Sequence, residues 1–172
     1  MKTTTILAII LLIGLWSCKK VDEFTQFNLP YNETIVVPAS TGISLPFNIF
    51  TPDIETNSES TFEVNDTRKD LIEEIVLREL NLTITEPSNG NFQFLKSVDV
   101  FLNADGLSEL KIAWADTVAS DIGKELILKT TTVDLKEYIK KDKFSLRLNT
   151  VTSEFLAEDH KIDLAALFFV DA

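Results

Sequence analysis

Few residues in this 172-residue chain have the type and spacing to do chemistry. The sole histidine, His160, lies in the charged segment Glu158-Asp159-His160-Lys161. Nucleophilic catalysis would need this ring beside a nucleophile and an acid. The chain holds no Gly-x-Ser-x-Gly motif, the sharp turn that presents a serine nucleophile. We therefore expect His160 to be a solvated turn residue, and we predict no catalytic residue.

Metal-ligating residues are equally sparse. One histidine and one cysteine cannot build a zinc site of nitrogen and sulfur ligands. Calcium prefers oxygen ligands, and Asn103-Ala104-Asp105-Gly106 has part of a calcium-loop pattern. The neighbouring positions that should hold acids hold Phe101 and Ile112, so the segment better fits a hairpin turn. We predict no cofactor, but two acidic groups leave an irregular surface calcium site open: Asp116 with Asp121, and Asp53 with Glu55 and Glu59.

Paired carboxylates for glycoside hydrolysis stay possible among 27 acidic residues, because the required separation is three-dimensional. Glycoside hydrolases usually line their sugar cleft with exposed aromatic rings, however, and most aromatic residues here fall at inward-facing positions of expected strands. No glycine-rich loop that could hold a phosphate is present. The residue types therefore favour a protein that is not an enzyme.

The only cysteine, Cys18, closes the run Leu15-Trp16-Ser17-Cys18 behind an apolar segment, Ile6 to Leu15. A membrane-spanning helix needs about 20 apolar residues. This run is shorter, follows Lys2 and precedes Lys19 and Lys20, as in a secretory signal. We predict a cleaved signal peptide over 1–17, a tether over 18–30 and one folded domain over 31–172.

Residues 1–18 resemble the signal of bacterial lipoproteins, whose lipobox has the form Leu-x-small-Cys. Leu15, Ser17 and Cys18 match this form, and Trp16 departs from it. The resemblance implies cleavage before Cys18, lipidation of its sulfur and usually a further acyl chain on its amino group. Two or more chains anchor a protein stably in a membrane. Ordinary secretion and an uncleaved N-terminal anchor are the alternatives.

The charge of the chain limits its partners. Removing residues 1–17 takes away one charged residue, Lys2, and moves the net charge from −11 to −12. Such a surface repels the phosphates of nucleic acids and of anionic membranes. We expect no nucleic-acid partner, and we expect membrane contact through acylated Cys18. The lysines that follow the cysteine leave both the periplasmic face and the cell surface open.

Beyond the tether, short apolar segments alternate with turn residues. Pro46 marks an edge strand or a bulged strand, because proline cannot donate to a sheet. Leu164 to Val170 is apolar at every position, which predicts a central strand. The expected strands are Ile35–Val37, Ile43–Phe50, Thr61–Val64, Val76–Ile84, Phe94–Leu102, Leu110–Trp114, Leu126–Val133, Phe144–Leu148 and Ile162–Val170. Thr51–Ser60 is expected to be a loop, and short helices are expected at Asn65–Glu74 and Leu135–Lys140.

These segments predict an all-β fold: an antiparallel, immunoglobulin-like β-sandwich of about nine or ten strands with one or two short helices. The likeness to immunoglobulin-like envelope lipoproteins is one of pattern alone, because the Cys…Trp…Cys signature is missing. We expect an outer-membrane lipoprotein that binds an envelope protein or a glycan without catalysis. The alternative is an accessory hydrolase or a carrier of an apolar ligand in the periplasm.

Overall fold

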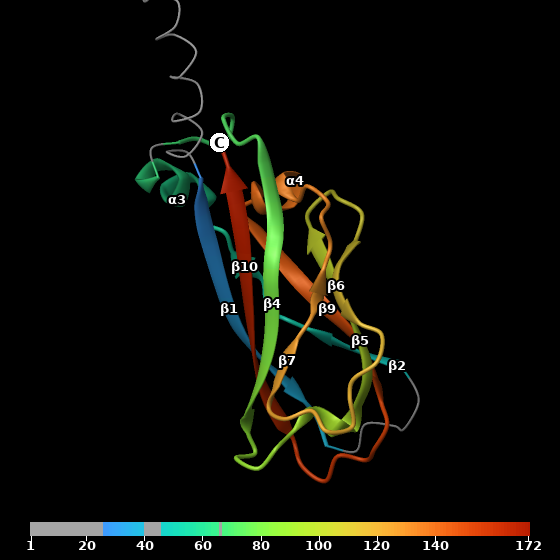
Figure 1. The fold of residues 1–172 in the computed structure, drawn as a ribbon. Helices are drawn as coiled ribbons and strands as arrows, with labels where there is room; N and C mark the ends of the chain where they lie inside the picture. The colour runs from blue at the N-terminus through green and yellow to red at the C-terminus, as the bar shows by residue number, and fades with distance from the viewer. Residues whose placement is uncertain (1–25, 40–45, 66) are drawn as a thin grey trace, which may run out of the picture.

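The computed structural model describes residues 26–39, 46–65 and 67–172, which form a two-layer β-sandwich (Figure 1). Cys18 lies outside the described residues. The smaller sheet has four strands in the order β1-β10-β4-β7, and the larger sheet has six, β2-β9-β5-β6-β8 with β3 beside β9. The strands of the smaller sheet are β1 (Phe27–Val37), β10 (His160–Asp171), β4 (Glu74–Glu86) and β7 (Glu125–Ile127). Those of the larger sheet are β2 (Pro46–Phe50), β3 (Ile54–Glu55), β5 (Leu95–Ala104), β6 (Leu110–Ala115), β8 (Lys129–Thr130) and β9 (Lys143–Thr152).

The prediction of an all-β antiparallel sandwich is confirmed, and every strand pair is antiparallel. The chain passes repeatedly between the sheets, so that β10 lies between β1 and β4 while β9 lies between β2 and β5. This order is that of a jelly roll, in which two Greek keys are rolled together. It differs from the immunoglobulin order, and the sequence pattern does not specify it.

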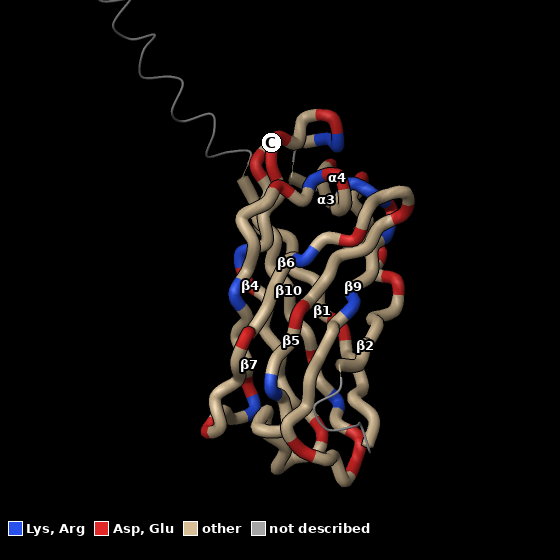
Figure 2. The backbone as a smooth tube through the Cα atoms, turned by 90° about the vertical axis from the view of Figure 1, so that its right-hand side faces the viewer, with Lys and Arg blue, Asp and Glu red and all other residues tan. Residues whose placement is uncertain are grey.

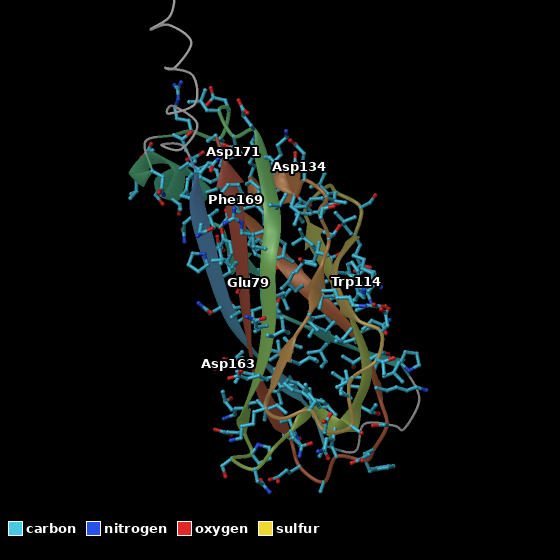
Figure 3. All side chains as sticks on the ribbon, viewed as in Figure 1. Glu79, Trp114, Asp134, Asp163, Phe169 and Asp171 are labelled. Atoms are coloured by element: carbon cyan, nitrogen blue, oxygen red, sulfur yellow. The ribbon has the colours of Figure 1, made fainter. Side chains whose placement is uncertain are left out.

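The central position expected for the last strand is confirmed. Every residue of β1 pairs with β10, and β4 pairs with β10 on its other side. Its inner residues are buried and its outer residues are partly exposed. Figure 3 shows Asp163 near the start of this strand and Phe169 and Asp171 near its end. The guanidinium of Arg78 covers the Phe169 ring at 3.7 Å from its centroid, so this outward-facing ring is shielded by a neighbouring side chain.

The core fills the space between the sheets. Tyr31 packs edge-on against Phe144 and Phe168, with ring centroids 5.2 and 5.7 Å apart. Burial raises the pKa of Tyr31 to about 12. Away from this cluster the sheets enclose a cavity of about 10 Å³, lined by apolar residues such as Ile35 and Leu148. That volume is about the space of one water molecule, so the interior is close-packed.

Three local predictions are wrong in the region between β3 and β4. Thr61–Val64 is not a strand but part of helix α3 (Ser58–Val64), and the described residues of the range 65–74 form no helix. The stretch expected as a loop, Thr51–Ser60, contains β3 and the first turn of α3. The sequence pattern does not indicate α3, because Phe62 is the only large buried residue of this helix and a helical spacing of apolar residues needs several. A second short helix, α4 (Lys136–Ile139), lies within the expected Leu135–Lys140.

Two other local predictions agree with the structure. The turn Asn103-Ala104-Asp105-Gly106 joins β5 to β6, and Gly106 has a φ of 74°, which a side chain would strain. Pro46 begins β2, which is an edge strand of the larger sheet. Phe92–Phe94 form a 3-10 turn that leads into β5. The sequence pattern therefore predicts most strands and the Asp-Gly hairpin.

The two ends of the sandwich differ. The helical end carries α3, α4 and the C-terminal residues, and the loop end carries Pro87–Asn91 and Ser153–Asp159 (Figure 1). β1 begins at the helical end, where the ring of Phe27 contacts Phe62 of α3 at 6.1 Å. Figure 2 shows acidic and basic positions interspersed along the strands and around the helical end. Among the described residues, no helix has the length and apolar character needed to cross a membrane.

Candidate functional site

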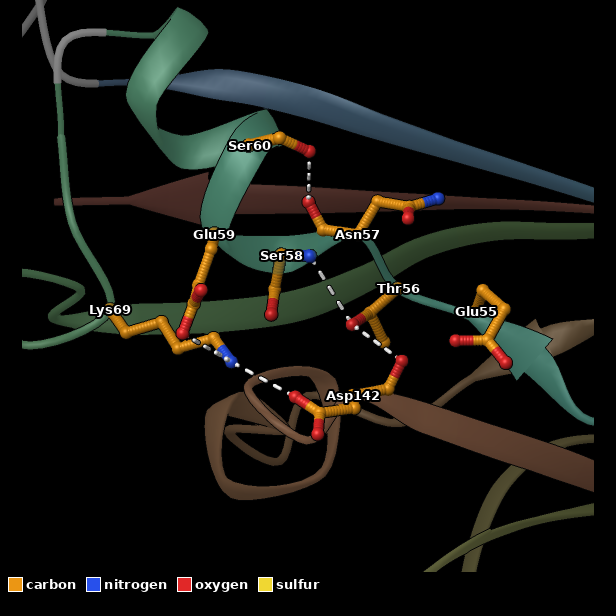
Figure 4. A pocket seen from close by; sticks show the side chains of 8 residues that line it. All are labelled: Glu55, Thr56, Asn57, Ser58, Glu59, Ser60, Lys69 and Asp142. Carbon is orange, nitrogen blue, oxygen red and sulfur yellow. Dashed lines mark hydrogen bonds and ion pairs between the residues drawn. The ribbon is translucent and has the colours of Figure 1, made fainter.

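The candidate site is a surface pocket of about 300 Å³ at the helical end, here called the Ser58 pocket (Figure 4). The chain reaches it three times: between β3 and α3, after α3, and between α4 and β9. Every lining side chain is polar or charged. The lining residues are Glu55, Thr56, Asn57, Ser58, Glu59, Ser60, Lys69 and Asp142.

Thr56 joins two of these segments and fixes the pocket wall. Its backbone amide donates to the carbonyl oxygen of Asp142 at 2.9 Å, and its hydroxyl donates to the carbonyl oxygen of Lys141 at 2.6 Å. The same hydroxyl oxygen accepts from the backbone amide of Ser58 at 3.3 Å. Thr56 is 3% exposed, so these bonds form away from water and hold the start of α3 against the start of β9.

Asn57 turns the chain into α3. Its φ of 45° and ψ of 32° place it in the left-handed region. Asparagine tolerates this region better than most residues with a side chain. The hydroxyl of Ser60 donates to the Asn57 carbonyl oxygen at 3.0 Å and supports the turn. The turn directs Ser58 inward while Glu59 stays exposed.

Lys69 lies between two carboxylates at the pocket rim. Its Nζ is 3.4 Å from Asp142 Oδ1 and 3.8 Å from Glu59 Oε1. The Glu59 and Asp142 side chains are 82% and 94% exposed, so these ion pairs contribute little to stability. With Glu55, the pocket has three carboxylates and one ammonium group. Its lining therefore offers both hydrogen-bond donors and acceptors, with acceptors in excess.

The hydroxyl of Ser58 is the unusual group of the site. Ser58 is 3% exposed, and its Oγ is one of two buried side-chain oxygens that have no hydrogen-bond partner among the described residues. In Figure 4 this oxygen points to the side of the pocket where Glu59, Lys69 and Asp142 lie. A buried polar atom without a partner is costly, and the few native examples require an explanation.

Sequence reasoning missed Ser58, Lys69 and Asp142. A signal for the helix was present, because Thr56-Asn57-Ser58-Glu59 fits the Ser/Thr-x-x-Glu pattern of a helix start. No sequence signal brings Asp142 to this pocket, since its approach depends on the pairing of β3 with β9.

His160, expected to be a solvated turn residue, is instead buried at the first position of β10, with 8% exposure. Its ring lies edge-on to Phe94, with centroids 5.0 Å apart. Nδ1 lies 3.0 Å from the carbonyl oxygen of Glu158 and donates to it, because that oxygen only accepts. The pairing of β10 with β1 extends through His160, which explains why a charged segment holds a buried ring.

Several of the acidic residues considered for calcium lie beside lysines. Asp116 pairs with Lys129 and Asp53 pairs with Lys143, an interaction that raises the pKa of Lys143. Glu59 lies at the Ser58 pocket with Lys69. Across residues 26–39, 46–65 and 67–172, no group of three or more histidine, cysteine, aspartate or glutamate side chains could hold a metal ion.

A second polar cluster lies on the outer face of the larger sheet, centred on Arg147 of β9. Its guanidinium lies over the Phe101 ring, at 4.2 Å from the centroid, and donates to Asn48 and Glu109. The hydrogen bond from Arg147 holds the pKa of Glu109 below its ordinary value. The charged groups of this cluster satisfy one another, unlike Ser58 in its pocket.

No family model matches this chain, and no curated protein matches its sequence. Among solved structures it is similar to the capsid of Helicobacter pylori bacteriophage KHP30, at 11% identity and a TM-score of 0.38, covering 84% of this chain and 92% of that chain. It is also similar to the cyanophage Pam1 capsid, at 6% identity and a TM-score of 0.40, covering 85% of this chain and 86% of that chain. These likenesses concern the two-sheet fold and extend no further.

Proposed function

We propose that this chain is a lipid-anchored, non-enzymatic binding module of a bacterial cell envelope. The observation that carries the proposal is the run Leu15-Trp16-Ser17-Cys18 behind an apolar segment. Acyl chains on Cys18 would hold the protein, and the folded domain would engage an envelope protein or a glycan. The described fold is compatible with this arrangement, because β1 begins at Phe27, nine positions after Cys18.

A binding role without catalysis is supported by the state of His160. The ring of this sole histidine packs on Phe94 and is bonded to a backbone carbonyl group. The ring and its Nδ1 are therefore engaged in the fold, as in a histidine with a structural role.

Binding at the surface is supported by the packed interior. The space between the sheets holds a cavity of about 10 Å³, whereas sites for small apolar ligands measure roughly 300–1,000 Å³. The alternative of an apolar-ligand carrier has little support from such a core. The strand edges offer little for docking either, since β7 and β8 are short and Pro30 and Pro46 lie in the edge strands β1 and β2.

Metabolic labelling with radioactive palmitate tests the anchor. Cells producing the natural chain should incorporate label into it, and cells producing Cys18→Ala should not. Label on the Cys18→Ala protein would refute lipidation at this residue. Cys18→Ala accumulates as a precursor of higher mass if cleavage depends on the modification, and immunoblotting measures that mass.

Cross-linking in intact cells tests the binding role. A photo-reactive residue in place of exposed Val64 on α3 should give a defined adduct with a protein or a glycan, and the same residue in place of exposed Phe155 provides a control at the loop end. The absence of a defined adduct at Val64 would count against a binding module. Protease treatment of intact cells then separates display at the cell surface from a periplasmic orientation.

A further inference from the structure

The unpartnered hydroxyl of Ser58 indicates what the Ser58 pocket binds. Burial of a hydroxyl without a partner destabilises a fold, and alanine at this position would avoid that cost. Ser58 is nevertheless 3% exposed, and its oxygen faces the pocket (Figure 4). A ligand that hydrogen-bonds to this oxygen would remove the free-energy cost of the unpaired hydroxyl, so Ser58 is suited to ligand binding.

The groups around Ser58 restrict the chemistry of that ligand. Glu59 and Asp142 each present carboxylate oxygens that accept, and Lys69 presents an ammonium group with three N–H donors, two of which suffice for its two ion pairs. A ligand with hydrogen-bond donors alone could not accept from Lys69. A ligand with acceptors alone would place its oxygens against two carboxylates, which cannot donate. Hydroxyl groups donate and accept at one atom, and neighbouring hydroxyls therefore match this mixed lining.

We propose that the Ser58 pocket binds a pair of neighbouring hydroxyl groups on a sugar residue or a similar polyol. The proposal rests on the binding function proposed above and names its ligand class. Ser58 Oγ exchanges a hydrogen bond with one hydroxyl, the Asp142 and Glu59 carboxylates accept from the pair, and Lys69 donates to a hydroxyl oxygen. The volume of about 300 Å³ accommodates a single sugar ring.

The position of the pocket leaves two sources for such a ligand. Phe62 of α3 contacts Phe27, the first residue of β1, so the pocket lies at the end of the sandwich that the N-terminal segment joins. A sugar headgroup of a membrane lipid and a sugar in solution both present neighbouring hydroxyls. The chemistry of recognition is the same for both.

Calorimetric titration of the full chain in detergent micelles with methyl glucoside, methyl galactoside, methyl mannoside and inositol tests the proposal. We expect at least one of these to bind, and Ser58→Ala to bind it about tenfold more weakly. Ser58→Ala should melt at the same temperature as the natural chain or higher, since the unpaired hydroxyl is gone. Failure of all four to bind at millimolar concentration, or equal binding by Ser58→Ala, would overturn the proposal.

Two further variants keep the test specific. Asp142→Asn replaces a carboxylate that is 94% exposed, so it should fold normally and bind several-fold more weakly. Ser153→Ala removes a hydroxyl at the loop end, where it donates to the Gln93 carbonyl oxygen, and should leave binding unchanged. Weaker binding by Ser153→Ala to the same degree would contradict a site at Ser58.

Vesicles separate the two sources. Phosphatidylcholine vesicles with and without a galactosyl diacylglycerol are floated with the full chain carrying Cys18→Ala, which has no acyl anchor, in the presence and absence of methyl galactoside. Flotation that needs the glycolipid, is abolished by the free sugar and is lost in Ser58→Ala assigns the headgroup. Calorimetric binding without such flotation assigns a soluble sugar. The absence of both signals refutes the proposal. A natural chain that takes up no palmitate label would refute the lipid anchor, and it would not change the outcome of the sugar-binding measurements.

Discussion

Arg147 on β9 and Glu109 in the β5–β6 turn form two parallel hydrogen bonds, Nε to Oε1 at 2.8 Å and Nη2 to Oε2 at 2.5 Å. The Arg147 side chain is 17% exposed, and its guanidinium covers Phe101. Such bidentate geometry is stronger than a single-contact ion pair. The pair links the hairpin to the neighbouring strand across the outer face of the larger sheet.

A double-mutant cycle should show this coupling. We expect Arg147→Gln and Glu109→Gln to be coupled by about 1 kcal/mol in the free energy of unfolding, at the upper end for pairs near the surface. Urea denaturation of the four proteins measures it. The pair Lys129 and Asp116, with side chains 69% and 67% exposed, provides the matched control and should show no measurable coupling. Equal coupling in both cycles would contradict a special role for the bidentate pair.

Asp134 should make stability depend on pH. Burial alone would raise its pKa, but hydrogen bonds from the backbone amides of Ile75 and Lys136 and from the Lys136 side chain outweigh it, so the folded-state pKa is lowered. The stabilisation is complete above the ordinary aspartate pKa and is lost as the pH falls through the lowered folded-state pKa. Asp134→Asn should cost about 1 kcal/mol at pH 7 and less in acid.

Urea titrations of the natural chain and Asp134→Asn between neutral and acidic pH measure this difference. The two stability curves should converge on the acid side. Curves that stay parallel would show that the Asp134 charge is not the source of the effect.

Phe62 should anchor α3. Its side chain is fully buried and contacts Phe27, so Phe62→Ala should lower the free energy of unfolding by about 3 kcal/mol or more. Val64 on the same helix is 83% exposed, and Val64→Ala should change stability by less than about 0.5 kcal/mol. Thermal melting followed by circular dichroism compares the two, and similar effects would contradict the observed helix orientation.

His160→Ala should destabilise the loop end. The substitution removes the edge contact with Phe94 and the bond to the Glu158 carbonyl oxygen, which together should be worth about 1–2 kcal/mol. Chemical denaturation gives the value. Unchanged stability would favour the solvated position that the sequence predicts.

Gly106 should be intolerant of a side chain for reasons of backbone conformation alone. Its φ of 74° strains any other residue, although a Cβ would meet no atom within 4 Å. Gly106→Ala should cost about 1 kcal/mol. Gly123 also has open space and does not share the positive φ, so Gly123→Ala should be neutral or slightly stabilising. Melting temperatures of the two variants in the opposite order would contradict this reasoning.

Local patterns predicted the strands well and the helical end poorly. The alternation in β9 and the Asp-Gly turn before β6 are properties of neighbouring residues, and both agree with the structure. The α3 segment has one large buried residue, Phe62, so its period is weak, and it was expected to be a loop and a strand. The buried state of His160 depends on its partner Val37, which lies far away in the sequence.

The sequence by itself determined the all-β class, the acidic charge and the position of the one lipidation candidate, Cys18. These follow from composition, short-range periodicity and a contiguous motif, which need no tertiary contact. The tertiary structure alone decided the jelly-roll order of the strands and the meeting of Ser58 with Lys69 and Asp142. The physical reason is that strands pair through hydrogen bonds between residues far apart in the sequence. Whether the Ser58 hydroxyl has a hydrogen-bond partner likewise depends on residues that only the folded chain brings around it.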